Sequence, residues 1–383
     1  MAKAFNPKYP STYDLRTRAK KRIPKFAFEY LDGGCNEDVS ISRNTEEIRK
    51  VQLQPRYLRN RGISATKTKV LGMEFDTPFG IAPVGLQGLM WPNSPEILAK
   101  AAFKHNIPFI LSTVTTTNIE RASELTEGKA WFQLYNPAQD ELRNAIIDRA
   151  AAAECPVLVL LCDVPTFGYR PRDIRNGLAL PPKMSVANIL QILGKPTWAI
   201  NTLKHGQPTF ETLRPYTPEG LNLKQLGQFM DKTFSGRLNE ERIKPIRDKW
   251  KGKLVLKGVA SLQDTEDAIR FGFDGIIVSN HGGRQLDAAE STISSLTEIA
   301  AKYGNQIEVM MDSGLRSGPD IARVMASGAK FTFMGRPFLY GCGALGKQGG
   351  DHTITMLKTQ FKQVMDQLCC ERVEDLPNHL IIN

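Results

Sequence analysis

Eight short apolar runs recur along this chain from residue 78 onward, and longer segments with apolar residues at helical spacing alternate with most of them. Continuous apolar runs bounded by turn residues are typical of strands that are buried on both faces. Eight such strands alternating with helices favour an α/β fold, a (β/α)8 TIM barrel, over a doubly wound sheet. The runs cover residues 78–84, 107–114, 130–135, 156–164, 253–259, 275–280, 307–314 and 330–336.

The chain of 383 residues is long enough for two domains, but barrels with insertions reach this length as one. We therefore expect residues 1–383 to form a single domain. The alternation is interrupted once, by residues 165–252 between the fourth and fifth runs. A connection of this length is usually functional, so we expect an excursion or a lid on the barrel.

Within this insertion, residues 184–206 combine apolar side chains with lysines. That composition is compatible with a segment at a lipid interface, most clearly over residues 186–205. The alternative, which we favour, is that the apolar residues pack on the barrel or on a neighbouring subunit. They are Ile189, Leu190, Ile192, Leu193, Trp198 and Ile200, beside Lys195 and Lys204.

The N-terminal region differs from the repeating part. A basic stretch over residues 16–22 precedes an apolar segment, Phe26–Leu31, which is followed by Gly33 and Gly34. Because glycine commonly ends a helix, we expect short helices that cover the barrel. The basic stretch is expected to be a solvated helix face, since no aromatic residues interleave it as in nucleic-acid-binding segments.

Charge and composition narrow the range of partners. Lysine and arginine number 50 and aspartate and glutamate 40, and the net charge of +10 favours anionic ligands such as carboxylates and phosphates. No apolar run is long enough to span a membrane, and the segment MAKAFNPKYP has no apolar signal region, so we expect a cytoplasmic protein. The six cysteines form no C-x-x-C pair and are expected to be reduced thiols. They are Cys35, Cys155, Cys162, Cys342, Cys369 and Cys370.

Polar residues end most of the predicted strands, where a barrel carries its chemistry. Because the carboxyl ends of all eight strands meet at one rim, we expect these side chains to converge there. Each has an ordinary interpretation by itself, such as a helix cap or a turn, so the hypothesis depends on their joint placement. The set contains Ser112, Thr113, Gln133, Tyr135, Asp163, Lys257, Ser279, Asn280, His281, Arg284, Asp312, Gly314, Gly335 and Arg336.

The residue types divide by chemical task. His281 is the natural general base because its unperturbed pKa lies near neutrality, and Asp163 can accept from its other ring nitrogen. Arg284 and Arg170 can each fork onto a carboxylate. Glycines that precede two arginines after the last two strands indicate a phosphate site, at Arg316 and Arg336.

Residues 341–346, Gly-Cys-Gly-Ala-Leu-Gly, match the G-x-G-x-x-G fingerprint of dinucleotide binding. That motif should open the first strand–helix–strand unit, with an acidic residue about 20 positions later. Here only one predicted helix and a tail follow, so we exclude a dinucleotide site.

The segment Ile277–Asp287 reads Ile-Val-Ser-Asn-His-Gly-Gly-Arg-Gln-Leu-Asp. It resembles the active-site signature of the FMN-dependent (S)-2-hydroxy acid oxidases and dehydrogenases. The similarity to this family extends from Ile23-Pro24-Lys25 to the C-terminal helix. The resemblance implies a (β/α)8 barrel that binds FMN. It also implies a homotetramer, since members of the family are commonly tetrameric.

The resemblance gives each candidate residue a role, and no Cys/His cluster has zinc-ligand spacing, so we expect no metal. His281 would take a proton from the substrate with Asp163 as its partner, and Tyr135 would hydrogen-bond the reacting oxygen. Lys257 would stabilise negative charge on the reduced flavin. The substrate carboxylate would be held by Arg284, Arg170 and Tyr30. The remaining cofactor contacts would come from Pro83, Val84, Gly85, Ser112, Gln133, Ser279, Asp312, Gly314, Arg316, Gly335 and Arg336.

Three positions depart from the oxidases of this family. Val114 stands where glycolate oxidase has tryptophan, which predicts a roomier substrate pocket. Leu161 replaces a threonine that meets the flavin in many relatives, and Gly85 replaces an alanine. The segment Leu89-Met-Trp-Pro92 and the Ser-Gly that follows Asp312 are similar to mandelate dehydrogenase, so the chain most resembles that branch.

The resemblance to this branch has consequences for the electron acceptor. Its members tend to react poorly with oxygen and to pass electrons to a membrane quinone through a lipid-binding insertion. In this chain such an insertion would fall within residues 165–252. Peripheral contact with the cytoplasmic face of a membrane would follow.

We therefore expect FMN-dependent oxidation of an (S)-2-hydroxy acid, with a bulky or aromatic side chain as in mandelate, to the 2-oxo acid, with a quinone-like acceptor. The first alternative is an oxidase of lactate or glycolate that uses oxygen and releases hydrogen peroxide. The second is a basic barrel that binds nucleic acid or membranes and has lost its chemistry. Because every catalytic position is occupied, we favour the enzyme and expect no nucleic-acid partner.

Overall fold

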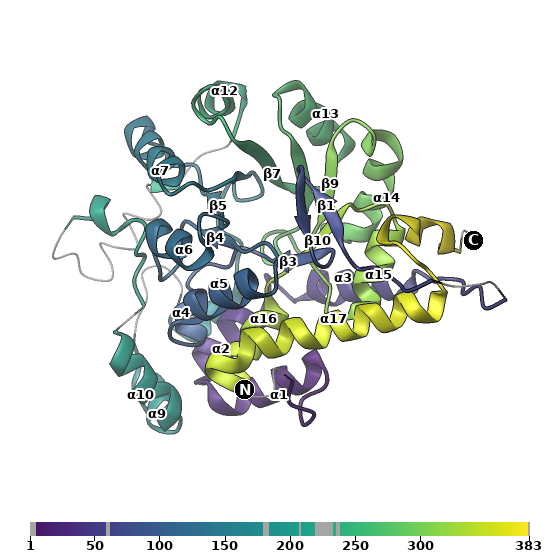
Figure 1. The fold of residues 1–383 in the computed structure, drawn as a ribbon. Helices are drawn as coiled ribbons and strands as arrows, with labels where there is room; N and C mark the ends of the chain where they lie inside the picture. The colour runs from purple at the N-terminus through teal and green to yellow at the C-terminus, as the bar shows by residue number, and fades with distance from the viewer. Residues whose placement is uncertain are drawn as a thin grey trace.

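The computed structural model describes residues 5–58, 62–178, 184–206, 208–218, 233–234 and 238–381. Eight parallel strands pair in the order β3-β10-β9-β8-β7-β6-β5-β4, and a parallel bridge between Ile81 and Phe109 joins the two ends of this series. The sheet is a nearly closed barrel surrounded by helices (Figure 1), which confirms the predicted (β/α)8 fold. The strands are β3 (Phe79–Ile81), β4 (Ile110–Ser112), β5 (Trp131–Leu134), β6 (Val157–Leu161), β7 (Lys253–Val259), β8 (Gly275–Val278), β9 (Glu308–Met311) and β10 (Phe331–Met334).

Burial on both faces explains why the strands are continuous apolar runs. Every residue of β6 is buried, and its side chains alternate between two apolar clusters. Val157 and Val159 belong to the cluster inside the barrel, whereas Leu158 and Leu160 pack against the surrounding helices. All eight predicted runs contain one of these strands.

A two-stranded hairpin closes the end of the barrel at which the strands begin. It consists of β1 (Thr68–Val70) and β2 (Met73–Phe75), paired antiparallel. The ring of Phe75 lies 6.4 Å from that of Trp131 and 5.6 Å from that of Phe331, which are the first residues of β5 and β10. A ligand therefore reaches the barrel from the opposite end, where the strands finish.

Helices follow the strands, and capping side chains set where several of them begin. Ser261, Ser291 and Ser317 each accept a hydrogen bond from the backbone N–H three residues later, at the starts of α13, α14 and α15. These are the residue types that the sequence places before its amphipathic segments. The helices around the barrel are α4 (Gln87–Met90), α5 (Ser94–Lys104), α6 (Ile119–Thr126), α7 (Asp140–Ala152), α12 (Glu240–Lys249), α13 (Leu262–Arg270), α14 (Thr292–Tyr303), α15 (Gly318–Ala326), α16 (Arg336–Leu345) and α17 (Gly349–Leu368).

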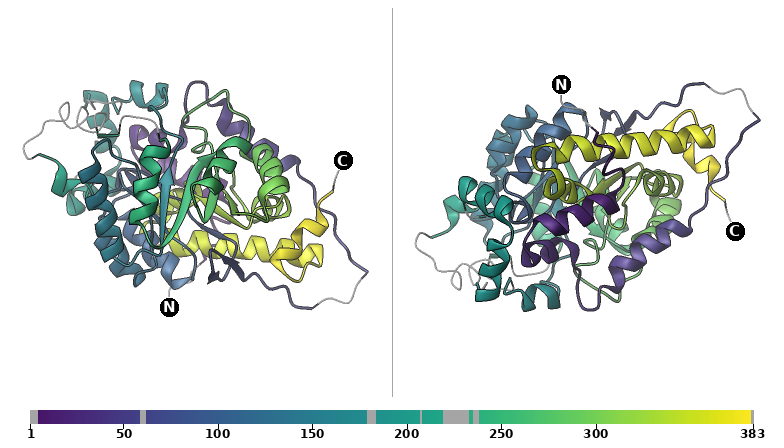
Figure 2. Two further views of the ribbon diagram at one scale, coloured as in Figure 1. Left: turned by 90° about the horizontal axis from the view of Figure 1, so that it is seen from above. Right: turned by 90° about the horizontal axis from the view of Figure 1, so that it is seen from below.

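Three N-terminal helices cover the barrel, as expected. They are α1 (Thr12–Arg22), α2 (Lys25–Asp32) and α3 (Val39–Lys50), and α1 packs along α16 (Figure 2). The close approach of these two helices requires glycine, because a Cβ on Gly343 would lie 2.5 Å from the side chain of Ile23. Three of the basic residues of α1, Lys20, Lys21 and Arg22, lie in its last turn, where cations are favourable.

The Gly-rich motif at residues 341–346 lies mostly within α16, which agrees with the exclusion of a dinucleotide site. Its glycines serve helix packing. A Cβ on Gly341 would lie 2.2 Å from Thr353 Oγ1 and 2.7 Å from the backbone oxygen of Gly349.

Helix α2 ends where the two glycines begin, as predicted, with Gly33 as its C-cap. The helix ends at Asp32, but Gly33 has a φ of −80° and does not form a left-handed cap. A Cβ on Gly34 would lie 2.4 Å from the carbonyl oxygen of Gly283. Glycine is needed here because two backbone segments touch.

The insertion after β6 is described in part, and the rest of residues 165–252 lies outside the described residues. It contains α8 (Pro171–Arg175), α9 (Val186–Leu193), α10 (Pro196–His205) and the 3-10 turn η1 (Arg214–Tyr216). Helices α9 and α10 project from the barrel at the lower left of Figure 1. Trp198 is buried, and its Nε1 donates to the carbonyls of Leu89 and Met90 at 3.2 Å.

Most other apolar residues of α9 and α10 are exposed, so the expectation that they pack on their own barrel is wrong for them. Ile192 is partly buried against the core. The large apolar residues exposed on the two helices are Val186, Ile189, Leu190, Leu193, Ile200 and Leu203.

Two features of the structure relate to the predictions of reduced cysteines and of a chain without a membrane-spanning segment. All six cysteines are free. Among the described residues, no helix has both the length and the apolar character needed to cross a membrane.

Candidate active site

A cavity of about 630 Å³ opens at the carboxyl ends of the strands, opposite the hairpin. All residues to which the resemblance gives a role line it except Asp163, which contacts His281 behind its wall, and Ser279, which contacts Lys257. The structure thus brings together residues that the sequence spreads from Tyr30 to Arg336.

Two of the strand-end residues, Thr113 and Asn280, do not line the cavity and instead form hydrogen bonds within the barrel framework. Thr113 is buried between β4 and β5, where its hydroxyl donates to the carbonyl of Gln133 at 2.6 Å. Asn280 exchanges side-chain hydrogen bonds of 2.8 Å with Asn44 of α3. A polar residue at a strand end therefore need not face the cavity, because some of these side chains hold the backbone at the strand end in place.

His281 is paired with Asp163 across the cavity wall. The distance from its Nδ1 to Asp163 Oδ1 is 3.0 Å, so Nε2 is left for a ligand. Burial lowers the pKa of His281, although the nearby carboxylate opposes this shift. Burial disfavours the charged form of Asp163, yet the attraction and hydrogen bond of His281 keep the pKa of Asp163 below its usual value. The pair is a neutral imidazole backed by a carboxylate, which suits a general base.

A glycine on the neighbouring strand makes room for this carboxylate. Gly258 of β7 has a φ of +104°, and a Cβ there would lie 2.6 Å from both Cβ and Cγ of Asp163. The register of β7 also shifts between Lys257 and Val259. The irregularity at the end of β7 therefore sets the position of Asp163.

Lys257 is a buried cation in a polar network. Its Nζ lies 3.0 Å from Ser279 Oγ and 3.0 Å from Asp312 Oδ2. Burial opposes its charge, but the carboxylates of Asp312 and Asp163 raise the pKa of Lys257 above its usual value. Ser313 extends the network, because its hydroxyl donates to Asp312 Oδ1 at 2.8 Å and accepts from the backbone N–H of Gly282 at 2.9 Å.

Two partly buried arginines, Arg284 and Arg170, and Tyr30 lie together at one end of the cavity. Arg284 donates through Nη1 to the carbonyls of Tyr30 and Gly33, and its guanidinium lies 5.0 Å above the Tyr30 ring. Burial and the neighbouring Arg170 lower the pKa of Arg284 to about 10. Two cations kept together in a desolvated wall bind an anion strongly.

Tyr135 stays protonated beside them. Burial and the carboxylate of Asp163 raise its pKa well above the usual value. Its hydroxyl is therefore a hydrogen-bond donor throughout the ordinary pH range.

Arg316 and Arg336 form a second cationic region near the start of α16. Burial lowers the pKa of Arg336 to about 10 and also lowers that of Arg316. Arg336 already donates to three carbonyls, those of Leu31, Gly33 and Gly282, at 2.8 to 3.0 Å. No ion pair to either arginine is recorded within the described part of the chain, so an anionic group fits beside them.

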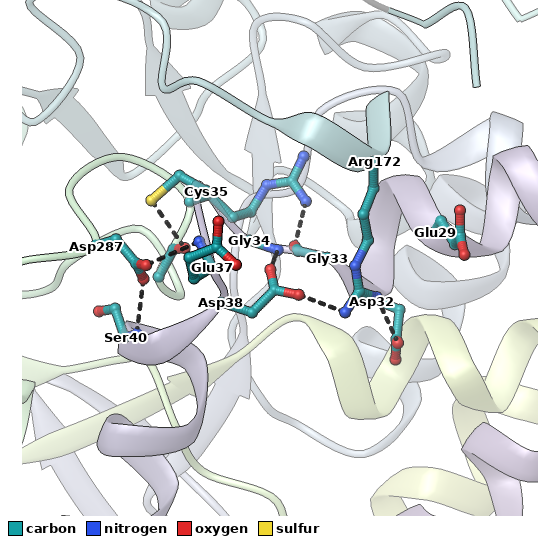
Figure 3. A network of polar contacts seen from close by, with 12 residues as sticks. Glu29, Asp32, Gly33, Gly34, Cys35, Glu37, Asp38, Ser40, Arg172 and Asp287 are labelled. Carbon is teal, nitrogen blue, oxygen red and sulfur yellow. Dashed lines mark hydrogen bonds and ion pairs between the residues drawn. The ribbon is translucent and has the colours of Figure 1, made fainter. Parts of the chain in front are cut away.

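A polar network holds the linker between α2 and α3 against the site (Figure 3). Arg172 of α8 pairs with Asp38 and lies 3.4 Å from Asp32. Asp287, the last residue of the signature segment, accepts from the backbone N–H groups of Glu37 at 3.0 Å and Ser40 at 2.8 Å. The network fixes the backbone carbonyls to which Arg284 and Arg336 donate.

The insertion adds cavity-lining residues that sequence reasoning missed. Asp173 lies beside the two arginines, 3.8 Å from Arg170 Nη1, and the ring of Phe234 packs 5.7 Å from that of Tyr135. No strand-end pattern marks individual site residues in the insertion, so only the folded cavity reveals them. The missed residues are Phe167, Tyr169, Asp173, Ile174, Leu178, Phe210 and Phe234.

Comparisons with known proteins agree with this geometry. A family described as FMN-dependent dehydrogenase matches residues 19–383. The L-lactate dehydrogenase of Vibrio parahaemolyticus is 34% identical over 370 residues, 96% of this chain and 97% of that protein. The (S)-mandelate dehydrogenase of Pseudomonas putida is 34% identical over 368 residues, 96% of this chain and 92% of that protein.

Solved structures of similar fold are also described as mandelate dehydrogenases and oxidases. A structure described as the monotopic membrane protein (S)-mandelate dehydrogenase superposes with a TM-score of 0.92 at 33% identity, covering 97% of this chain and 99% of that one. A mandelate oxidase superposes with a TM-score of 0.82 at 28% identity, covering 97% and 98%.

Proposed function

This chain belongs to the FMN-dependent dehydrogenase family, whose members are oxidoreductases acting on CH–OH donors, and we propose that it oxidises an (S)-2-hydroxy acid with a bulky or aromatic side chain to the 2-oxo acid. One observation carries this proposal most directly. A neutral histidine backed by a carboxylate faces the same cavity as two partly buried arginines. A base next to a carboxylate-binding site is what removal of a proton from a 2-hydroxy acid requires.

The residues of the cavity fit FMN. Gln133 Nε2 is buried without a hydrogen-bond partner in the described part of the chain. It can therefore donate a hydrogen bond to a ligand in the cavity. We propose that Ser112, Gln133 and Lys257 hold the flavin ring, with Pro83, Val84, Gly85 and Ser279 beside it. The ribityl chain would contact Asp312, and the phosphate would lie by Gly314, Arg316, Gly335 and Arg336. When bound, FMN accepts the equivalent of a hydride and passes the electrons on.

The remaining steps belong to side chains of this protein. Arg170 and Arg284, with the Tyr30 hydroxyl, would hold the substrate carboxylate, and Tyr135 would donate to the substrate hydroxyl oxygen. His281 would take a proton at Nε2, and Asp163 would stabilise the imidazolium that forms. A fixed positive charge on Lys257 would lower the energy of negative charge that develops in the dry cavity.

The composition of the cavity wall supports the proposed preference for a bulky side chain. Val114 and Gly85 both line the cavity, and a Cβ on Gly85 would lie 2.9 Å from Val114 Cγ2. Gly85 is thus packed against Val114, and the rings of Phe210 and Phe234 also line the cavity. Lactate is the second candidate substrate, since relatives of equal identity are named L-lactate dehydrogenase.

We further propose that electrons pass to a quinone-like acceptor at a membrane surface. The exposed apolar residues of α9 and α10 support this, together with the monotopic mandelate dehydrogenase among the similar structures. The cytoplasmic location and the homotetramer stay predictions, and light scattering of the purified protein measures the latter.

The first experiment is an anaerobic visible spectrum of the purified protein before and after addition of (S)-mandelate. A flavin band that bleaches at once supports the cofactor, the site and the bulky substrate together. Bleaching by (S)-lactate alone would overturn the interpretation of Val114. Rapid reoxidation on admission of air, with peroxide release, would favour the oxygen-using alternative.

A further inference from the structure

Gln285 follows Arg284 in the signature segment but does not line the cavity. Its side-chain amide nevertheless makes four hydrogen bonds, and all four go to the loop between β6 and α8. Nε2 donates to the carbonyls of Asp163 at 3.0 Å and Thr166 at 3.1 Å. Oε1 accepts from the backbone N–H of Gly168 at 3.3 Å and from Arg170 Nη2 at 3.2 Å. The full hydrogen-bonding capacity of the amide is used.

The two loops also touch through their backbones. A Cβ on Gly168 would lie 2.2 Å from the carbonyl oxygen of Arg284 and 3.1 Å from Cα of Gln285. That same carbonyl of Arg284 accepts from Arg170 Nε at 3.3 Å. This backbone contact does not depend on the hydrogen bonds of the Gln285 amide. It places the Gln285 side chain within hydrogen-bonding distance of residues along the loop between β6 and α8.

The loop that Gln285 holds carries two predicted functional residues and has no regular secondary structure between Leu161 and Pro171. Asp163, at one end, backs His281, and the amide fixes its backbone carbonyl. Arg170, at the other end, has its guanidinium oriented by Gln285 and by the Arg284 carbonyl.

We propose that Gln285 is a positioning residue for the proposed oxidation. It fixes Arg170 for the substrate carboxylate and Asp163 behind the base, so one side chain sets the distance between the carboxylate clamp and His281. The inference rests on the proposed function of the same site. An amide is required because the loop presents two carbonyls on one side and two N–H donors on the other, which neither Glu nor Met can satisfy.

The test compares Gln285→Met with Gln360→Met in the FMN-loaded protein. Gln360 is a matched control, because its amide also ties two backbone segments, accepting from Gly318 N–H at 3.0 Å and donating to the Pro10 carbonyl at 3.3 Å, away from the cavity. The affinity for phenylacetate and for acetate, carboxylates that cannot be oxidised at a 2-hydroxyl, is measured through the flavin absorption. We expect Gln285→Met to weaken binding about tenfold and Gln360→Met to leave it unchanged, with similar losses of melting temperature.

A double-mutant cycle then asks whether Gln285 acts through Arg170. In the Arg170→Met background, Gln285→Met should change the affinity for these carboxylates less than about twofold, since the clamp is already lost. Losses that multiply, or a single Gln285→Met variant that binds as the wild type does, would overturn the inference. In kinetics with (S)-mandelate or (S)-lactate, Gln285→Met should raise KM and also lower kcat, because both the clamp and the base are displaced.

Failure of the proposed function looks different. It would show in the wild-type protein, as a flavin that no 2-hydroxy acid bleaches and no carboxylate perturbs. A wild type that is reduced normally, with a Gln285→Met variant indistinguishable from it, would remove only the inference about Gln285.

Discussion

At the scale of single residues, the turn after β8 carries unusual backbone angles. His281, Gly282 and Gly283 all have left-handed φ values, of 58°, 67° and 74°. Glycine adopts this conformation freely, whereas for histidine it costs about 1 kcal/mol or more. Local bonds offset that cost, since the His281 N–H donates to Ser279 Oγ at 3.1 Å and the ring pairs with Asp163.

The first prediction concerns the base itself. His281→Gln should lower kcat by about 10²–10⁴-fold while the protein keeps FMN, because the cavity stays formed and only proton removal is lost. The measurement is turnover with a soluble dye together with the flavin absorption per chain. His205→Gln is the control, since His205 is exposed on α10 and bonds only within its own helix. Near-normal turnover in His281→Gln would contradict the base role.

The second prediction is a pH dependence. Burial lowers the pKa of His281 below its ordinary 6.5, so the imidazole stays neutral and able to accept a proton at pH values where a free histidine is already charged. The kcat/KM should therefore be retained at pH 6.5 and be lost only as the pH falls through the lowered value. An acid limb centred above pH 6.5 would show that the attraction of Asp163 outweighs burial.

Single residues also show how far sequence reasoning reaches. The signature segment and the strand ends predicted nearly all of the cavity-lining polar residues. The type of each residue indicates its chemistry, and its position at a strand end indicates that it faces the site. Gly258 and Asp173 could not be predicted, since one acts by an absent side chain and the other lies in the insertion, where no strand-end pattern marks site residues.

At the scale of elements, the strands were predictable and the insertion was not. A strand buried on both faces has one apolar pattern, and β6 follows it throughout. The composition of residues 184–206 favoured packing on the barrel or on a neighbouring subunit, but most of the large apolar side chains of α9 and α10 are exposed. Trp198 is the exception, because its indole N–H reaches the end of α4.

The third prediction concerns these two helices. Replacing Leu193, 70% exposed, and Leu203, 84% exposed, by glutamate should release the protein from phospholipid vesicles without loss of dye-linked activity. Both side chains are exposed to solvent, so we expect the fold to tolerate the introduced charges. Tyr13→Glu with Ile63→Glu is the matched control, as both residues are exposed elsewhere at 71% and 88%. A wild-type protein that never sediments with vesicles would contradict the membrane proposal.

At the scale of the whole molecule, the barrel encloses more positive charge than its own side chains neutralise. Lys257 has Asp312 as a partner, but Arg316 and Arg336 bond mainly to carbonyls. The net charge of +10 adds long-range repulsion. A bound anion therefore contributes to stability as well as to chemistry.

The fourth prediction follows from that imbalance. Removal of FMN should lower the melting temperature, and at a hundredfold excess over Kd the cofactor should stabilise the fold by about 3 kcal/mol. Inorganic phosphate added to the apoprotein should restore part of the difference, since it occupies the Arg316 and Arg336 region. Arg336→Met should abolish the phosphate effect. A melting temperature indifferent to FMN would contradict the assignment of the cavity.

The pairing of β10 with β3 has a consequence for synthesis of the protein. The strand that closes the barrel lies about as far along the chain as the topology allows, so closure waits until most of the polypeptide has left the ribosome. Tyr30 emerges early and Arg336 late, and both line the same cavity. The residues that line the cavity are all present only after β10 has been synthesised, so we expect a chain truncated before β10 not to hold the cofactor.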